Sequence, residues 1–344
     1  MEFDLPVTYA PMEAQAVDAI PSESGWQYEP KWDGFRALVF RNGDEIVIQS
    51  KSSKPLGRYF PEVVERLRSI PARHFVLDGE LVIPIADALS FDDLLGRIHP
   101  AASRVAMLAH EHPATLLVFD LLVDGDGTVL VDRPLHERRD ALERFFQTQA
   151  IDENLGIRLS PMTTDIAVVE DWYRRIGGAL DGVVAKRIDL PYASGERTAV
   201  QKIKRSHTVD CVVGGFRYAA DRRSVGSLLL GLYDEGRLDY VGFCSAFDRA
   251  ERVRLLERLE ALREAPGFDG NAPGGPSRWN RGKDRSWEPL RPELILEVAF
   301  DQATSGRFRH GTRPLRWRPD KAPKACTREQ VERPDRSFRL LLSD

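Results

Sequence analysis

Apolar and polar positions alternate along the first part of the chain in patterns that predict both strands and helices. Residues 35–50 form two alternating runs joined at Asn42-Gly43, a dipeptide typical of a tight hairpin. Residues 61–70 begin with a proline and carry apolar side chains at three-to-four spacing. This spacing predicts a helix with proline at its first position.

The same pattern continues to about residue 205. Residues 74–84 are expected to form a pair of interior strands, because Asp78-Gly79 interrupts the apolar run. Further helices are expected at 91–100, 135–146 and 171–178, and further strands at 115–127, 181–188 and 198–206. The last two strands carry lysines at alternating positions, so these lysines share one face of a sheet.

After residue 206 the pattern changes to short alternating strands with glycine-rich turns. Such strands are expected at 210–218, 226–244 and 293–302. One amphipathic helix at 248–264 and a loop rich in Gly and Pro at 265–279 interrupt them. About five short strands with one helix favour a small barrel of the oligonucleotide-binding type. We therefore expect two domains, 1–205 and 206–344.

Composition excludes several classes of protein. The chain has 344 residues, of which 42% are hydrophobic and 30% charged, so neither disorder nor a membrane role is expected. No run of about 18 apolar residues occurs, and the start lacks a basic stretch followed by an apolar one. We expect a cytoplasmic protein. Its three widely spaced cysteines are expected to be buried and reduced, and its seven histidines show no metal-ligand pattern.

Charge is distributed unevenly along the chain. The net charge is −4, yet residues 277–324 hold twelve Lys and Arg against six Asp and Glu. Three of the six tryptophans, Trp279, Trp287 and Trp317, lie in the same window. Basic residues interleaved with aromatics suit contacts to phosphates and stacking on bases. A charged face around core tryptophans explains the window equally well.

Five stretches offer the side chains of a nucleotide site. The usual P-loop is absent, since its nearest match has Ser277 and Asp284 at required positions. A nucleotide would therefore be held by side-chain cations and carboxylates. Such groups occur at Lys31–Arg36, Asp78–Glu80, Phe119-Asp120, Asp181–Lys186 and Lys202–Lys204. Each stretch is a weak signal alone, but their order and spacing together are specific.

These stretches resemble the motifs of covalent nucleotidyltransferases. The resemblance is closest to the minimal two-domain ATP-dependent DNA ligases of bacteria, of the ligase C and ligase D type. That family places K-x-D-G-x-R, D-G-E, F-D, acid-G-V-V-x-K and K-x-K in this order, and an R-x-D-K element like Arg318–Lys321 near the end. The resemblance covers nearly the whole chain. It implies an α+β fold: a nucleotidyltransferase (adenylation) domain with antiparallel sheets flanked by helices, followed by an OB-fold β-barrel.

The resemblance also implies roles for individual residues. Lys31 would attack the α-phosphate of ATP, and Arg36 would contact the nucleotide. The residues expected to bind the rest of the nucleotide are Glu29 at the adenine edge, Phe119 on the adenine face, Glu80 at the ribose, and Lys51 and Lys186 in support. Phe119 in an apolar strand is also compatible with an ordinary core position.

Phosphate chemistry would fall to a second group of residues. Lys202 and Lys204 would contact the α-phosphate, and Asp320 with Lys321 would orient the departing pyrophosphate. Asp181 with Glu80 would hold Mg²⁺ or Mn²⁺. The chain departs from the family pattern at three positions: Asp181 replaces Glu, Val200 replaces Trp, and Lys51 replaces Arg, which exchanges a bidentate fork for a point charge.

A nucleophilic lysine needs positive charges near it, because they lower its pKa. A lysine with a reference pKa near 10.4 is protonated at neutral pH, so a nucleophilic Lys31 needs a pKa lowered by roughly two to three units. Arg36, Lys186, Lys202, Lys204 and a bound metal could lower it. The reaction would have three steps: AMP moves to the lysine, then to a DNA 5′-phosphate, and is finally displaced by a 3′-hydroxyl. All three steps place negative charge at the same position.

The sequence thus predicts a monomeric ATP-dependent DNA ligase that acts on nicked duplex DNA, in repair rather than bulk replication. A repair polymerase or an end-binding protein is a possible partner, and no membrane partner is expected. Two alternatives stay open: an RNA ligase or mRNA-capping guanylyltransferase, and a non-catalytic nucleic-acid-binding protein of the same fold.

Overall fold

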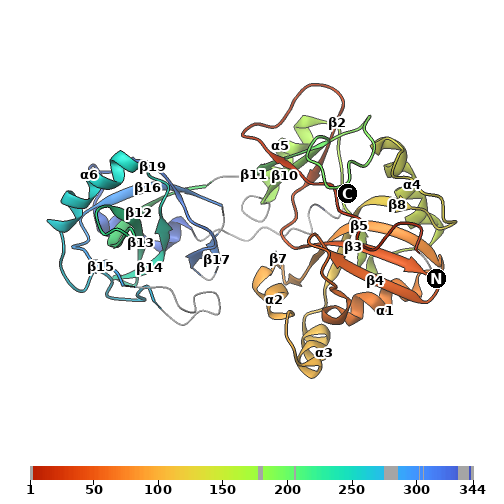
Figure 1. Ribbon diagram of the computed structural model, residues 1–344, viewed down its shortest axis with the longest axis horizontal. Coiled ribbons are helices and arrows are strands. Elements are labelled where there is room, and N and C mark those ends of the chain that lie inside the picture. The colour runs from red at the N-terminus through yellow and green to blue at the C-terminus, as the bar shows by residue number, and fades with distance from the viewer. Residues whose placement is uncertain are drawn as a thin grey trace. The chain divides into compact units, whose positions relative to one another are not determined.

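The computed structural model describes residues 3–176, 181–204, 207–274, 286–301, 303–304, 306–331 and 341. These residues fall into two compact units (Figure 1). Unit 1 holds the described residues up to Lys204 together with Leu341, and unit 2 holds those from His207 to Val331. Each unit has its own hydrophobic core.

The larger sheet of unit 1 has five strands in the order β4-β3-β5-β8-β9. They are β3 (Phe35–Asn42), β4 (Glu45–Ser50), β5 (His74–Val82), β8 (Thr115–Val123) and β9 (Ile157–Leu159). All neighbours are antiparallel except β8 and β9. The predicted hairpin is confirmed, because Asn42 pairs with Glu45 and Gly43 has a φ of +63°.

A second sheet of unit 1 carries the lysine-bearing strands. Its order is β1-β11-β10-β2, formed by β1 (Gln15–Ala16), β2 (Trp26–Pro30), β10 (Gly182–Arg187) and β11 (Val200–Lys204). Strands β10 and β11 agree with the predicted strands, and both β2 and β11 pair antiparallel with β10. A small hairpin, β6 (Pro84–Ile85) and β7 (Ala88–Leu89), stands apart.

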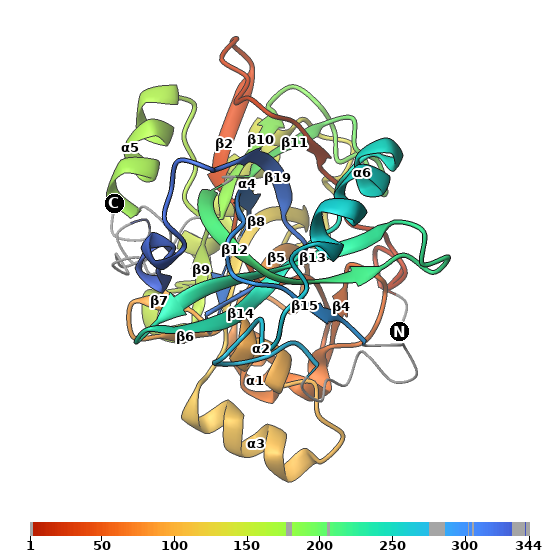
Figure 2. The same cartoon turned by 90° about the vertical axis from the view of Figure 1, so that its left-hand side faces the viewer.

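Helices of unit 1 pack on both of its sheets. They are α1 (Pro61–Ser69), α2 (Phe91–Gly96), α3 (Ala102–Glu111), α4 (Leu135–Thr148) and α5 (Ile166–Ile176), with short 3-10 turns at η1 (Gly57–Tyr59) and η2 (Glu153–Leu155). Helix α1 begins at its proline as predicted. Helix α4 packs Phe145 edge-to-face on Phe75 of β5, with ring centroids 5.4 Å apart. Helix α3 lies at the outer end of the unit in both views (Figure 1, Figure 2).

The Asp78-Gly79 pair is not a turn, so the predicted strand pair at 74–84 is wrong. Strand β5 runs through both residues, and its pairing with β8 shifts register between them. A Cβ atom at Gly79 would lie 2.6 Å from the carbonyl oxygen of Leu117. The glycine therefore allows close approach of β8 rather than reversal of the chain.

Helix α5 begins at Ile166, ahead of the predicted start at 171. Its predicted end at Gly177-Gly178 lies outside the described residues, as do Trp279 and the basic positions 278, 281, 283 and 285. In the parts of the chain that the structure describes, no helix is both long enough and apolar enough to cross a membrane.

Unit 2 is built on one antiparallel sheet in the order β14-β13-β12-β16-β19. The strands of this sheet are β12 (His207–Tyr218), β13 (Val225–Asp234), β14 (Arg237–Cys244), β16 (Ile295–Phe300) and β19 (Arg313–Trp317), with β15 (Glu288–Pro289) paired to β12. A separate pair is formed by β17 (Ala303–Thr304) and β18 (Arg307–Phe308). Helix α6 (Arg249–Glu260) and two 3-10 turns, η4 (Pro323–Ala325) and η5 (Arg328–Gln330), complete the unit.

The described strands of unit 2 do not close into a continuous barrel. Near the two edges of the sheet, Cys244 at the end of β14 forms a single isolated bridge with Thr312 beside β19. An OB fold is a partly open barrel, so the strand set still fits that topology. The three cysteines are buried and free, which confirms the prediction made for them.

Two features bear on other sequence-based expectations. Trp287 and Trp317 are partly buried against the core of unit 2, which favours the core interpretation for these two residues. Leu341 packs in a core cluster of unit 1 with Val169 and Trp172, although the expected second domain, 206–344, includes it.

Candidate active site

Lys31 lies in the short loop between β2 and β3, held against the start of β10. Its backbone N–H donates to the carbonyl oxygen of Gly182 at 2.9 Å. Its side-chain ammonium forms an ion pair with the carboxylate of Asp181, which directly precedes β10. The structure therefore brings together the first and the fourth predicted motifs, which lie 150 residues apart in sequence.

Gly34 allows the same loop to lie flat on β5. Its N–H donates to Oε1 of Glu80 at 3.1 Å. A Cβ atom at this position would lie 2.2 Å from the carbonyl oxygen of Leu81 and 2.9 Å from Cγ of Glu80. Any side chain at residue 34 would therefore push the lysine loop away from Glu80.

Glu80 is held in an environment that disfavours its charge. Burial raises the pKa of its carboxyl to about 7, and the opposing attractions of Arg36 and Lys31 only partly offset this effect. A carboxyl with this pKa changes protonation near neutral pH. It can therefore accept or donate a hydrogen bond, depending on its state.

Arg36 on β3 is fixed by a buried carboxylate. Its Nε and Nη2 atoms donate to the two oxygens of Asp78 at 2.5 and 2.6 Å. The hydroxyl of Tyr192 donates to the same carboxylate at 2.6 Å and accepts from the N–H of Met12 at 3.0 Å. Burial raises the pKa of Tyr192 well above 10, so the hydroxyl stays a donor. Sequence reasoning missed Tyr192, because no motif surrounds it.

Phe119 on β8 lies beneath two cations. The guanidinium carbon of Arg36 is 4.5 Å from the centre of its ring and Nζ of Lys186 is 4.3 Å away. Lys186 is paired with the buried Glu29 at 2.8 Å, and Glu29 also accepts from Gln27 at 2.8 Å. The structure thus brings four of the residues predicted to bind the nucleotide into one contact group.

Asp120, next to Phe119, has a structural contact. Both of its oxygens accept from Arg138 of α4, at 2.8 and 2.9 Å, and both side chains are almost fully buried. This ion pair fastens α4 to β8.

A group of lysines gives this part of unit 1 a positive potential. The pKa of Lys202 is lowered, first by burial and then by the positive charges of Lys51, Lys31 and Lys204. Several positive charges gathered around one lysine form an attractive site for an anion. Lys51 is also paired with Glu13 at 3.1 Å and is largely exposed. Val200, a departure from the family pattern, is buried in the core of unit 1.

The carboxylates of Glu80 and Asp181 fit a magnesium-type ion better than a closed metal site. Among the described residues, no group of three or more His, Cys, Asp and Glu side chains could hold a metal. Mg²⁺ is commonly held by one or two carboxylates together with phosphates and water. Two carboxylates beside a group of lysines suit that arrangement.

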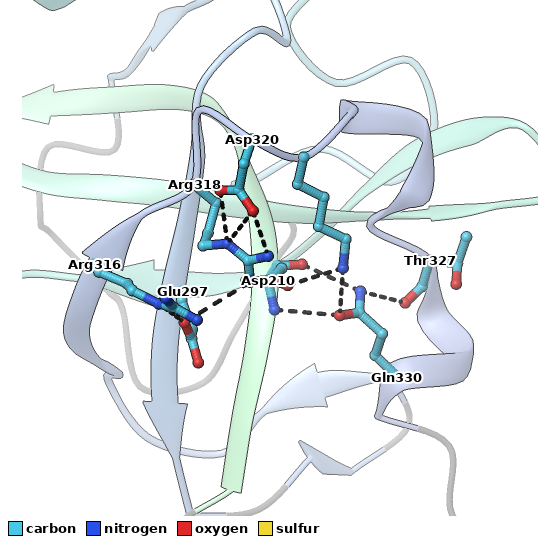
Figure 3. Close-up of polar contacts among 8 residues, drawn as sticks. Asp210, Glu297, Arg316, Arg318, Asp320, Thr327 and Gln330 are labelled. Atoms are coloured by element: carbon cyan, nitrogen blue, oxygen red, sulfur yellow. Dashed lines mark hydrogen bonds and ion pairs between the residues drawn. The ribbon is translucent and has the colours of Figure 1, made fainter.

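Asp320 and Lys321 lie in unit 2, after β19. Asp320 accepts from Arg318 at 2.9 Å (Figure 3). Lys321 donates to Asp210 of β12 at 2.8 Å. The contact with Arg318 lowers the pKa of Asp320 to about 2, so this carboxylate is ionised at neutral pH. Asp210 carries no motif and was not predicted from the sequence.

Comparison with known proteins agrees with the motifs. A family model described as the ATP dependent DNA ligase domain matches residues 11–204, and one described as the ATP dependent DNA ligase C terminal region matches residues 221–321. The chain is 46% identical to DNA ligase C1 of Mycolicibacterium smegmatis over 96% of both chains. It is 43% identical to DNA ligase C of Mycobacterium tuberculosis over 94% of both chains.

A solved structure gives the same result for the fold. The ligase domain of M. tuberculosis LigD is 28% identical, with a TM-score of 0.50 over 97% of this chain and 100% of that one. The predicted resemblance and the α+β fold class are confirmed. The chain belongs to the ATP-dependent DNA ligase family.

Proposed function

We propose that the protein seals nicks in duplex DNA with ATP, through a covalent lysyl-AMP intermediate on Lys31 and an adenylated DNA 5′-phosphate. One observation carries this proposal. Lys31, Glu80 and Asp181 meet in unit 1 from three separate segments, beside the lysines of β10 and β11. A nucleophile, two carboxylates and several cations are the groups that nucleotidyl transfer requires.

In the first step, the amine of Lys31 attacks the α-phosphorus of ATP. A phosphorus–nitrogen bond forms, the bond from the α-phosphorus to the bridging oxygen breaks, and pyrophosphate leaves. Lys31 must first give up its proton and its ion pair with Asp181. The DNA 5′-phosphate then takes AMP from the lysine, and the 3′-hydroxyl attacks that 5′-phosphate, forming the phosphodiester bond and releasing AMP.

The surrounding residues would hold the nucleotide during these steps. Phe119 would stack on the adenine, Glu29 would read its edge, and Glu80 would accept from the ribose. Arg36 would keep its place through Asp78, which both of its donor nitrogens contact. Lys202 and Lys204 would neutralise the charge that develops on the α-phosphate.

Asp181 and Glu80 would also hold a divalent cation, Mg²⁺ or Mn²⁺. When bound, such an ion neutralises charge on the phosphates. Asp181 cannot serve a cation and the ammonium of Lys31 equally well. Loss of its contact with Asp181 would leave Lys31 without its counter-ion before the attack.

Intact-mass spectrometry tests the proposal. The purified protein, incubated with ATP and a divalent ion, is expected to gain the mass of one AMP and to lose it when pyrophosphate is added. Lys31→Ala should prevent both the mass gain and the sealing of a nicked duplex. Lys54→Ala removes an exposed lysine elsewhere in unit 1 and should leave both unchanged. Nick sealing that survives Lys31→Ala would contradict the proposal.

The alternatives have different signatures. A stable GMP adduct formed from GTP would indicate a capping-type guanylyltransferase, and preference for nicked RNA over nicked DNA would indicate an RNA ligase. The monomeric state, the cytoplasmic location, and recruitment by a repair polymerase or end-binding protein stay predictions from the sequence.

A further inference from the structure

Asp210 is a buried carboxylate in the first strand of unit 2, and it holds two cations of the R-x-D-K element. Both of its oxygens accept from Nη1 of Arg318, at 3.0 and 2.9 Å, and Oδ2 also accepts from Lys321 at 2.8 Å. Its side chain is only 11% exposed. Hydrogen bonds between charged partners in a partly buried place are the strong kind.

Gln330 completes this arrangement from η5. Its Nε2 donates to the carbonyl oxygen of Asp210, and its Oε1 accepts from the N–H of the same residue, at 3.2 and 3.3 Å. Gln330 thus acts as a strand partner for β12 at a point where β13, whose pairing begins at Val212, has not started. Its Oε1 also accepts from Lys321 at 3.4 Å.

The ammonium of Lys321 therefore has two protein acceptors. A lysine ammonium has three N–H donors, so one donor is left for a phosphate oxygen. Within the described residues, no further acceptor contacts this ammonium. The two fixed contacts determine the direction in which the third donor points.

The charges around Asp210 balance. Figure 3 shows Arg318 between Asp210 and Asp320, with Glu297 and Arg316 on one side and Gln330 with Thr327 on the other. Arg316 pairs with Glu297 across the β16–β19 ladder. Three carboxylates thus face three cations, and each cation has a specific acceptor. Specific ion pairs, and not an excess of one charge, hold these side chains in place.

We propose that Asp210 is a positioning residue that sets Lys321 and Arg318 for the adenylation of Lys31. It would touch neither nucleotide nor DNA. The inference rests on the proposed function, because orientation of pyrophosphate is needed only while the triphosphate reacts. Sealing of a nick that already carries AMP involves no pyrophosphate, so that step should not depend on Asp210.

The test variant is Asp210→Asn. The amide keeps the shape of the side chain, but it loses the negative charge and one of the two acceptor oxygens, and its own N–H donors replace that oxygen beside the cations. Loss of a hydrogen bond between charged groups is expected to lower the single-turnover rate of lysyl-AMP formation by about tenfold to hundredfold. Affinity for ATP should stay equal or become tighter, because the variant adds one net positive charge.

Sealing of a chemically pre-adenylated nick separates this role from a general defect. We expect Asp210→Asn to seal it within about twofold of the wild-type rate. Glu260→Gln, the matched control, removes a carboxylate that pairs with Arg263 in the same unit, and both steps should keep wild-type rates. Equal losses in both steps for Asp210→Asn would overturn the inference and indicate a structural role.

A double variant tests the route through Lys321. If Asp210 acts by positioning this ammonium, Asp210→Asn should add little to the loss caused by Lys321→Ala, whereas independent effects would add. If Asp210→Asn shows no cooperative melting, Gln330→Ala replaces it in the assay. That variant should slow adenylation alone, and an unchanged rate would overturn the inference. Absence of lysyl-AMP in the wild-type protein would instead refute the proposed function.

Discussion

Glu80 gives a direct test of how burial controls charge in the site. Its pKa is raised from 4.5 to about 7, mainly by burial. Because the unfolded chain releases this proton at lower pH, the native state holds more protons between these two values. The contribution of the protonated side chain to stability is therefore complete below pH 4.5 and is lost as the pH rises through 7.

The size of the effect follows from the two pKa values. A rise from 4.5 to about 7 corresponds to about 3 kcal/mol in the free energy of unfolding, at about 1.4 kcal/mol for each pKa unit. The variant Glu80→Gln cannot ionise, and its amide oxygen can still accept from Gly34. We expect it to be more stable than the wild-type protein by about 1 kcal/mol or less at pH 5 and by up to about 3 kcal/mol at pH 8.

Urea unfolding at a series of pH values from 5 to 8 measures this difference. The tryptophans of unit 1 report its unfolding by fluorescence, and the other titrating groups cancel because both proteins share them. Glu65→Gln, at an exposed carboxylate on α1, controls for the loss of one charge. A stability difference that stays constant across the series, or grows toward low pH, would show that burial does not raise the pKa of Glu80.

Three further predictions concern the same site. Asp181→Asn removes the partner of Lys31 and one expected metal ligand, so the divalent-ion concentration needed for half-maximal adenylation should rise about tenfold or more; an unchanged metal titration would contradict this role. Tyr192→Phe deprives Asp78 of a donor and should cost about 1.5 to 3 kcal/mol of stability in urea unfolding, together with slower adenylation; wild-type values in both would refute the support we assign to the hydroxyl. Lys51→Arg introduces a planar fork and should lower the KM for ATP severalfold in steady-state assays; an equal or higher KM would argue against a phosphate contact.

Short sequence patterns predicted many of the helices and strands, but two similar dipeptides show the limit of such patterns. Asn42-Gly43 and Asp78-Gly79 carry the same turn signal, and only the first forms a hairpin. What decides the second is the nearby backbone of Leu117, which lies 38 residues further along the chain. No local window contains that information, so a single sequence could not separate the two cases.

In the candidate site, too, the sequence predicted some residues and only the structure revealed others. Motif order led to Lys31, Glu80 and Asp181, and in the structure Asp181 pairs with Lys31 while Glu80 accepts from Gly34 in the same loop. The residues that support the motifs are different. Tyr192 and Asp210 lie in segments without a motif, and their importance comes from single contacts with a motif residue or with its partner. Such contacts depend on tertiary packing and leave no spacing pattern in the sequence.

Gly34 has a consequence for recognising distant or damaged members of the family. A side chain at this position would clash with the backbone of β5, so the requirement for glycine is steric and not catalytic. A related protein that had lost the reactive lysine but kept the fold would still need a glycine at this position, because the loop still lies against β5. In an unrelated protein that carries the lysine motif by chance, no strand would lie so close to the loop, and the glycine would not be needed. The glycine is therefore a marker of inherited architecture, and the lysine is a marker of retained chemistry.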